Sequence, residues 1–133
     1  MNEKQLKIVQ LYSRDMNIYG DNGNLLVLEK RAVWHGYTPE ITCYNPGDPF
    51  PEEVDIVIGG GGQDSGQGTI QDDLLTIAER LRTLADSGTP MLMICGLYQL
   101  FGRFFKTVDG TTIKGIGVLD LETHAGAERL IGN

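Results

Sequence analysis

The chain has 133 residues, the size of one ordinary domain. Hydrophobic residues make up 41% of it and charged residues 22%, which excludes a low-complexity or generally disordered protein. Because 18 Asp and Glu outweigh 11 Lys and Arg, the net charge of −7 argues against a protein that binds nucleic acid.

Apolar, β-favouring runs alternate along the chain with helical patterns. Strands are predicted at 6–12, 38–45, 54–58 and 90–94, helices at 25–34, 70–86 and 97–105, and short β-like runs at 113–121 and 129–131. The run 90–94 is almost wholly apolar, as expected of a strand that is buried on both faces of a parallel sheet. The alternation predicts an α/β fold with a mainly parallel sheet, and no linker or repeat divides the chain.

The sequence carries no signal for export or membrane insertion. Residues 1–5 lack the apolar stretch of a signal peptide, and no apolar run approaches the roughly 18 residues of a membrane span. We therefore expect a cytoplasmic protein in which Cys43 and Cys95 are free thiols. No Cys/His cluster has the spacing of a zinc site.

Cys95 is the candidate nucleophile. It follows an apolar strand and precedes a helix, so its thiol is expected near a helix N terminus, where unpaired N–H groups favour the thiolate. In such a turn the backbone N–H of the next residue, Gly96, can form half of an oxyanion hole. The alternative is an unreactive buried cysteine, and position alone does not separate the two.

Four of the 18 glycines form an unbroken run at 59–62, directly after another predicted strand. Such a run lets the backbone approach a ligand closely and point its N–H groups inward. It fits neither the dinucleotide-binding nor the Walker pattern, and no lysine follows it. Two interpretations of the run remain: an oxyanion hole and substrate wall facing Cys95, or a loop without chemical importance. Since the carboxyl ends of parallel strands share one edge, we expect the run and Cys95 to border one cleft.

Four further polar residues have a structural and a functional interpretation. Asp21 opens the first predicted helix, where capping is the favoured role. Arg129 is either a solvated surface residue or a clamp for a substrate carboxylate. His35 and His124 are the only imidazoles, and neither has a convincing position as the base for Cys95.

Several segments resemble class I (triad-type) glutamine amidotransferases, and most closely their cobyric acid synthase-like group. The matching segments are 93–102 around Cys95, 11–24, the glycine-run segment 55–64, 115–120 and 128–133. Together they cover essentially the whole chain, in order and spacing. The motif at 19–24 and the segment around Arg129 point to the branch of glutaminase subunits that serve lipid II isoglutaminyl synthase.

The resemblance implies a flavodoxin-like α/β fold with helices on both sheet faces, and a role for each motif residue. Cys95 would attack the side-chain amide of glutamine, form a γ-glutamyl thioester and release ammonia. The N–H groups of Gly96 and of Gly61, or a glycine adjacent to it, would hold the oxyanion. Further residues would bind the substrate or support the site: Gly60, Gln99, Arg129 and, in the supporting role, Asp21.

The resemblance also implies a partner. Ammonia would pass to a Mur ligase-like synthetase subunit of the MurT type, which amidates the D-glutamate of lipid II in peptidoglycan synthesis. ATP and Mg would belong to that partner, so no cofactor is expected in this chain. The alternatives are an amidotransferase domain of the cobyric acid synthase type and a non-catalytic docking module.

The chain departs from the family pattern in two ways. Met93 and Leu97 stand where many members have glycine, which makes a tight turn at Cys95 harder to build. The family's catalytic histidine lies beyond Asn133, and neither His35 nor His124 corresponds to it. We therefore expect residues 1–133 to be the N-terminal portion of a single amidotransferase domain, inactive or weakly active alone.

Overall fold

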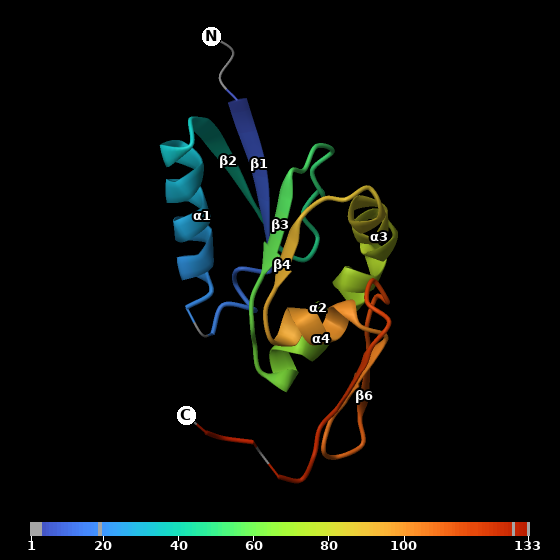
Figure 1. The fold of residues 1–133 in the computed structure, drawn as a ribbon. Coiled ribbons are helices and arrows are strands. Elements are labelled where there is room, and N and C mark those ends of the chain that lie inside the picture. The colour runs from blue at the N-terminus through green and yellow to red at the C-terminus, as the bar shows by residue number, and fades with distance from the viewer. Residues whose placement is uncertain (1–3, 19, 129, 133) are drawn as a thin grey trace.

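The computed structural model describes residues 4–18, 20–128 and 130–132 (Figure 1). In chain order its elements are β1 (Lys4–Leu11), α1 (Asn22–Trp34), β2 (Tyr37–Tyr44), β3 (Ile56–Gly59), α2 (Asp64–Thr76), α3 (Ala78–Asp86), β4 (Met91–Met93), α4 (Gly96–Phe101), β5 (Phe104–Lys106), β6 (Thr112–Lys114) and β7 (Glu122–His124). No helix in these ranges is both long and apolar enough to cross a bilayer.

The main sheet has the strand order β2-β1-β3-β4, and all of its pairs are parallel. Leu11 pairs with Gly59, and Gly59 pairs with Met93, so three strands end level with one another. The predicted α/β fold with a mainly parallel sheet is confirmed. Figure 1 shows α1 on one side of the sheet and α2, α3 and α4 on the other.

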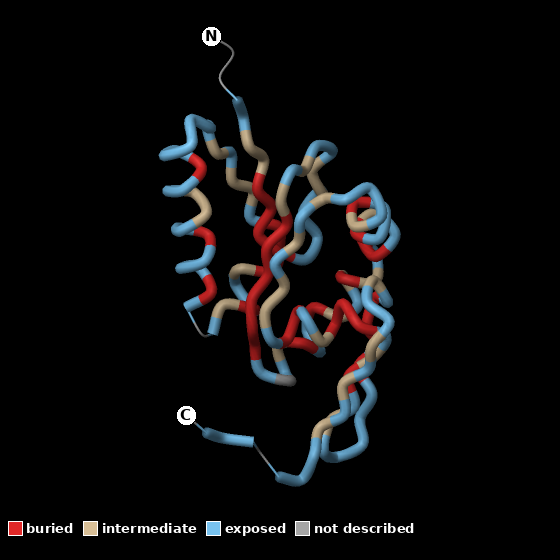
Figure 2. The backbone as a smooth tube through the Cα atoms, viewed as in Figure 1, coloured by how far each residue is buried: buried red, intermediate tan, exposed pale blue. Residues whose placement is uncertain are grey.

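Alternate residues of the strands build a core on each face of the sheet. On the α1 side, Ile8 and Ile58 pack with Leu25 in a small cluster. On the other side, Val9 and Val57 belong to a larger cluster that includes residues of α2, α3 and α4. Figure 2 shows this buried interior running along β1 and β3. The central strands are therefore the scaffold that fixes their carboxyl ends.

The helix predicted at 70–86 is wrong in both its start and its continuity. The structure has two helices there, α2 from Asp64 to Thr76 and α3 from Ala78 to Asp86, which meet at Ile77. The prediction missed the first turns of α2 because Gly66 and Gly68 have poor helix propensity. A side chain at Gly66 would lie only 3.2 Å from the carbonyl oxygen of Asp15, so this helix approaches the β1–α1 loop closely.

The C-terminal predictions are also revised. The helix predicted at 97–105 ends at Phe101, where Gly102 takes an extended conformation, and β5 begins at Phe104. Beside it, β6 runs antiparallel and β7 parallel, forming a second sheet of order β6-β5-β7. Of the run 113–121 only the start is a strand, and residues 130–131 form none, while Arg129 lies outside the described residues.

The prediction that the strand at 90–94 is buried on both faces is wrong. Within the described residues β4 pairs only with β3, and Leu92 is 42% exposed. Leu92 is the register neighbour of Ile58 and lies on the α1 face. Because α1 packs over β1 and its neighbours, the apolar side chain of this edge strand stays accessible on that face.

Candidate functional site

Loops from three neighbouring strand ends meet at the carboxyl edge of the main sheet. The N–H of Ile94 donates to the carbonyl oxygen of Gly59 at 3.0 Å, and that of Leu97 to Gly60 at 3.3 Å. The N–H of Ile18, in the β1–α1 loop, donates to Gly61 at 3.2 Å. The glycine run therefore lies between the Cys95 turn and the β1–α1 loop.

Cys95 occupies a strained position between β4 and α4. Its φ of 52° and ψ of −110° lie in a region that side-chain-bearing residues rarely adopt. Such strain is commonly held at active sites, and it occurs in the strand-to-helix turns that expose a nucleophile. Cys95 is exposed and has no disulfide partner. The next residue, Gly96, opens α4, so its backbone N–H has no acceptor within the helix.

Gly59 provides the room for this turn. A Cβ atom at Gly59 would lie 2.3 Å from Cδ1 of Leu97 and 3.1 Å from Sδ of Met93. The two larger residues that seemed to hinder a tight turn therefore fill the space that Gly59 leaves. The small residue at this contact comes from β3 instead of from the nucleophile segment.

Asp21 binds the glycine run and does not cap α1. Its Oδ2 accepts a hydrogen bond of 3.1 Å from the N–H of Gly61, and its side chain makes no capping bond. Asn17 accepts from the N–H of Asn22 at the helix start instead, so the capping role predicted for Asp21 is wrong. Asp21 is buried against Gly60, where a Cβ would lie 2.4 Å from its Cγ. The N–H of Gly61 is thus engaged by a carboxylate in this structure.

Gln67, which the sequence interpretation did not single out, lies against Gly96, the residue that follows Cys95. It is 1% exposed, and its Nε2 donates to Oε1 of Gln99 at 3.0 Å. A Cβ at Gly96 would lie 2.9 Å from the same Nε2. Gln67 escaped notice because the helix predicted at 70–86 begins after it. A helix start recognised directly after the glycine run would have placed it beside the Cys95 turn.

Asp73 is a second polar residue that the sequence interpretation missed. Its Oδ2 accepts from the hydroxyls of Tyr12 at 2.6 Å and Tyr44 at 2.9 Å, and its Oδ1 from the N–H of Gly47 at 3.0 Å. Burial, with the hydrogen bond to Asp73, raises the pKa of both tyrosines above the usual value. The carboxylate therefore joins α2 to the ends of β1 and β2.

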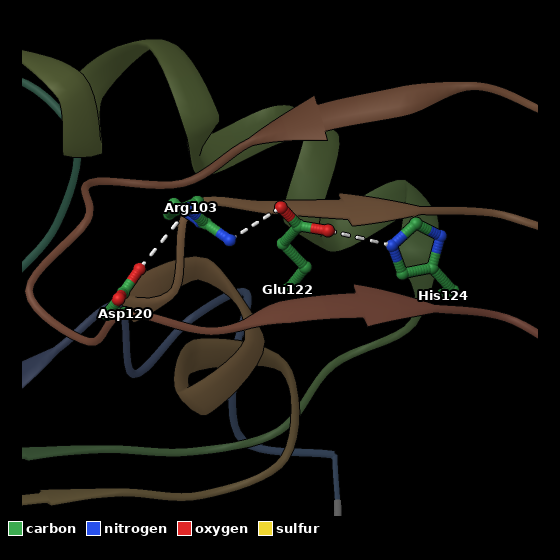
Figure 3. Close-up of polar contacts among 4 residues, drawn as sticks. All are labelled: Arg103, Asp120, Glu122 and His124. Atoms are coloured by element: carbon green, nitrogen blue, oxygen red, sulfur yellow. Dashed lines mark hydrogen bonds and ion pairs between the residues drawn. The ribbon is translucent and has the colours of Figure 1, made fainter.

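The structure gives neither histidine the surroundings of a base for Cys95. His35 follows α1 and lies near the start of β1, because Tyr37 pairs there with Lys4, at the opposite end of the sheet. His124 lies on β7, where its Nε2 is 3.1 Å from Oε2 of Glu122 (Figure 3).

Glu122 joins His124 to a surface cluster of charges. The other carboxylate oxygen of Glu122 accepts from Arg103 at 2.7 Å, and Arg103 also contacts Asp120 at 3.3 Å. Figure 3 shows the four side chains in one line along the small sheet. Because these contacts lie at the surface, they account for His124 as a structural surface residue. Among the described residues no group of three or more His, Cys, Asp or Glu is arranged to hold a metal ion.

The strand-to-helix cysteine turn beside a glycine loop, on an α/β sheet, is the arrangement expected of a glutamine amidotransferase domain. Residues 7–133 match the family of CobB/CobQ-like glutamine amidotransferase domains. The chain belongs to this family, and the resemblance inferred from its motifs is confirmed.

The relatives are more specific. The chain is 34% identical over 130 residues to the lipid II isoglutaminyl synthase (glutamine-hydrolyzing) subunit GatD of Staphylococcus aureus, covering 97% of this chain and 54% of that protein. It is 39% identical over 116 residues to GatD of Streptococcus pneumoniae, covering 86% and 45%. The chain thus spans about half the length of these relatives. Cobyric acid synthase of Mesorhizobium japonicum is 31% identical over 104 residues, covering 71% and 20%.

Proposed function

We propose that this chain is part of a glutaminase subunit that supplies ammonia to a lipid II-amidating synthetase. The observation that carries the proposal is the strained, exposed Cys95 turn beside the glycine loop, in a chain similar to two GatD subunits along most of its length. The weaker similarity to cobyric acid synthases covers less of the chain and supports the corrinoid alternative less well.

Cys95 acts as the nucleophile in this proposal. Its sulfur attacks the side-chain amide carbon of glutamine, and the carbonyl oxygen becomes an oxyanion. The N–H of Gly96, at the open first turn of α4, donates to that oxyanion. The carbon–nitrogen bond then breaks, the nitrogen leaves with an added proton as ammonia, and a γ-glutamyl thioester remains on Cys95. Water hydrolyses the thioester to glutamate and regenerates the thiol.

The glycine loop forms the other wall of the proposed site. Gly60 lines it, and the N–H of Gly61 is the second candidate donor to the oxyanion. Because Gly61 donates to Asp21 in this structure, it would have to exchange that partner to take this role. Until that exchange, the hydrogen bond to Asp21 holds the glycine loop in place. Gln99 and Arg129 are the proposed contacts to the glutamine substrate, and Arg129 lies outside the described residues.

Proton transfer needs a group that Cys95 can reach. His35 lies at the far end of the sheet, and His124 contacts Glu122. The GatD relatives are about twice as long as this chain, and we place the base in the corresponding further residues of the full-length protein. The partner, a Mur ligase-like synthetase of the MurT type, would use ATP to activate the D-glutamate carboxylate of lipid II in the cytoplasm.

The test is ammonia release from glutamine by the full-length protein together with its synthetase subunit. Cys95→Ala should abolish it, and the wild type should carry a γ-glutamyl adduct that mass spectrometry assigns to Cys95. Cys43→Ala is the matched control, because Cys43 is also a free, exposed thiol but lies on β2. Full activity in Cys95→Ala would refute the mechanism. Amidation of a corrinoid acid in place of lipid II would favour the cobyric acid synthase alternative.

A further inference from the structure

We propose that Gln67 is a positioning residue for glutamine binding, which orients the amide of Gln99 toward the substrate. The inference rests on the proposed glutaminase function and names a residue that the family resemblance did not. Gln67 lies on α2, the helix that follows the glycine run, while Gln99 lies on α4, the helix that follows Cys95. Their hydrogen bond therefore joins the helices behind the two walls of the site.

The direction of this bond fixes which face of the Gln99 amide is free. Gln67 donates through Nε2 at 3.0 Å, so Oε1 of Gln99 is used as the acceptor. The NH2 group of Gln99 is then left to donate elsewhere. Gln99 lies one helical turn beyond Cys95, and its N–H donates to the Cys95 carbonyl at 3.0 Å. A long side chain on a helix covers the turn that precedes it, so we expect this NH2 group to face the Cys95 turn.

The burial of Gln67 argues against a role in packing alone. Its side chain is 1% exposed, and its Oε1 has no hydrogen-bond partner within the described residues. A buried acceptor without a partner destabilises the fold, and an apolar side chain of similar length would avoid that cost. An amide at this position is therefore explained by what its Nε2 does.

The surroundings leave the Gln67 amide little freedom to turn away. It lies against the Cα of Gly96, where an added Cβ would be 2.9 Å from Nε2 and 3.4 Å from Cδ. Met16, also fully buried, lies on the same side of this glycine, with Cε at 2.7 Å from that Cβ position. Gln67 is thus held between the backbone of the nucleophile turn and the side chain of Gln99.

The experiment compares steady-state glutaminase kinetics of the full-length protein, with its synthetase subunit, for wild type and Gln67→Met. Methionine keeps the length of the side chain and removes the donor. We expect the KM for glutamine to rise about five- to thirty-fold, with kcat changed by no more than about two-fold. Gln71→Met is the matched control, because Gln71 lies one turn further along α2 and its Nε2 is 3.4 Å from the carbonyl oxygen of Lys114. It should leave KM unchanged.

A mutant cycle with Gln99→Met separates positioning from an independent role. If Gln67 acts through Gln99, the double variant should have the KM of Gln99→Met alone. An unchanged KM in Gln67→Met, or two effects that add in full, would overturn the inference while Cys95-dependent ammonia release stands. Absence of that release from the wild-type complex would overturn the proposed function and the inference together.

A second variant covers the possibility that Gln67→Met does not fold. Gln67→Glu keeps the shape but can only accept, so Gln99 must turn its NH2 group inward and present Oε1 to the substrate. Alkylation of Cys95 by a glutamine-shaped electrophile should slow about five- to thirty-fold, while alkylation by iodoacetamide should not. Equal slowing with both reagents, or slowing with neither, would contradict a role in positioning the substrate.

Discussion

Replacing Tyr12 by Phe tests the hydrogen bonds that converge on Asp73. The Tyr12 hydroxyl donates to this carboxylate at 2.6 Å, and a hydrogen bond to a charged group contributes about 1.5–3 kcal/mol. Asp73 would keep the Tyr44 hydroxyl and the N–H of Gly47, so we place the loss near the lower end, at about 2 kcal/mol. Phe at position 12 keeps the edge contact with the ring of Tyr44, whose centroid lies 5.6 Å away. The backbone strain of the positive φ at position 12 is the same for Tyr and Phe.

Urea unfolding followed by far-ultraviolet circular dichroism measures this loss. We expect the midpoint to fall by about 1 M, with an unchanged dependence of the unfolding free energy on urea. The single tryptophan, Trp34, is 78% exposed and is a poor probe of burial. Tyr37→Phe is the control, since Tyr37 lies at the surface at the opposite end of the sheet and should unfold as wild type. If Tyr12→Phe behaved like Tyr37→Phe, the Asp73 contacts would not stabilise the junction of α2 with the strand ends.

Three further outcomes are expected. Gly60→Ala would place a methyl group 2.5 Å from a backbone carbonyl oxygen and should lower the free energy of unfolding by about 3 kcal/mol. Gly68→Ala, in open space on α2, should raise it by about 0.5–1 kcal/mol. Equal thermal stabilities of the two variants would contradict the packing of the glycine run. Asp21→Ala should lower the free energy of unfolding in urea by about 1.5–3 kcal/mol, and Asp21→Asn should lower it less, because only Asn keeps an acceptor for the N–H of Gly61. Equal losses in the two variants would show that this hydrogen bond contributes nothing to stability. Because the pKa values of Tyr12 and Tyr44 are raised, the folded protein keeps phenol protons that the unfolded chain releases at high pH. The contribution of these two tyrosines to the free energy of unfolding is therefore fully present below pH 10.0 and is lost as the pH rises above it. Equal unfolding free energies at about pH 8 and about pH 11 would contradict this.

The sequence was sufficient to predict the framework of the site. Strand 54–58 and the apolar run before Cys95 were recognisable because each is a short, largely apolar run followed by glycine or a Cys-Gly break. Their carboxyl ends had to meet at one edge, and the structure brings the glycine run and the Cys95 turn together there. These features depend on local composition and on general rules of sheet topology.

The start of α2 could not be predicted because its glycines disfavour a helix locally and their use depends on a tertiary contact. Gly66 and Gly68 disfavour a helix locally, but a residue with a side chain at Gly66 would crowd the β1–α1 loop. Because the first turns of α2 were not predicted, Gln67 was not expected beside Gly96 and Gln99, the neighbours that give it its importance. Long-range pairs of polar side chains leave no periodic pattern in the sequence.

The exposure of β4 has a different cause. Its apolar composition correctly predicts a strand, but composition does not specify how many partners a strand has within a given stretch of chain. Leu92 is exposed because β4 is the edge strand of the sheet within the described residues and Leu92 lies outside the small cluster that packs under α1. The contact of Asp21 with the glycine run was not predicted, since a residue at a helix start is expected to cap that helix, whereas its hydrogen bond crosses to the loop after β3.

The contact of Gly59 with Met93 and Leu97 restricts the order in which these positions can change during evolution. A side chain added at Gly59 first forces the buried Leu97 side chain to shift, because Cδ1 of Leu97 lies 2.3 Å from where the new Cβ would stand. Shortening Leu97 first leaves a cavity, which is costly but can be survived, and the larger residue on β3 can then fill it. A chain with a small residue at 97 and a larger one at 59 is therefore reached more easily when Leu97 is shortened first than when Gly59 is enlarged first.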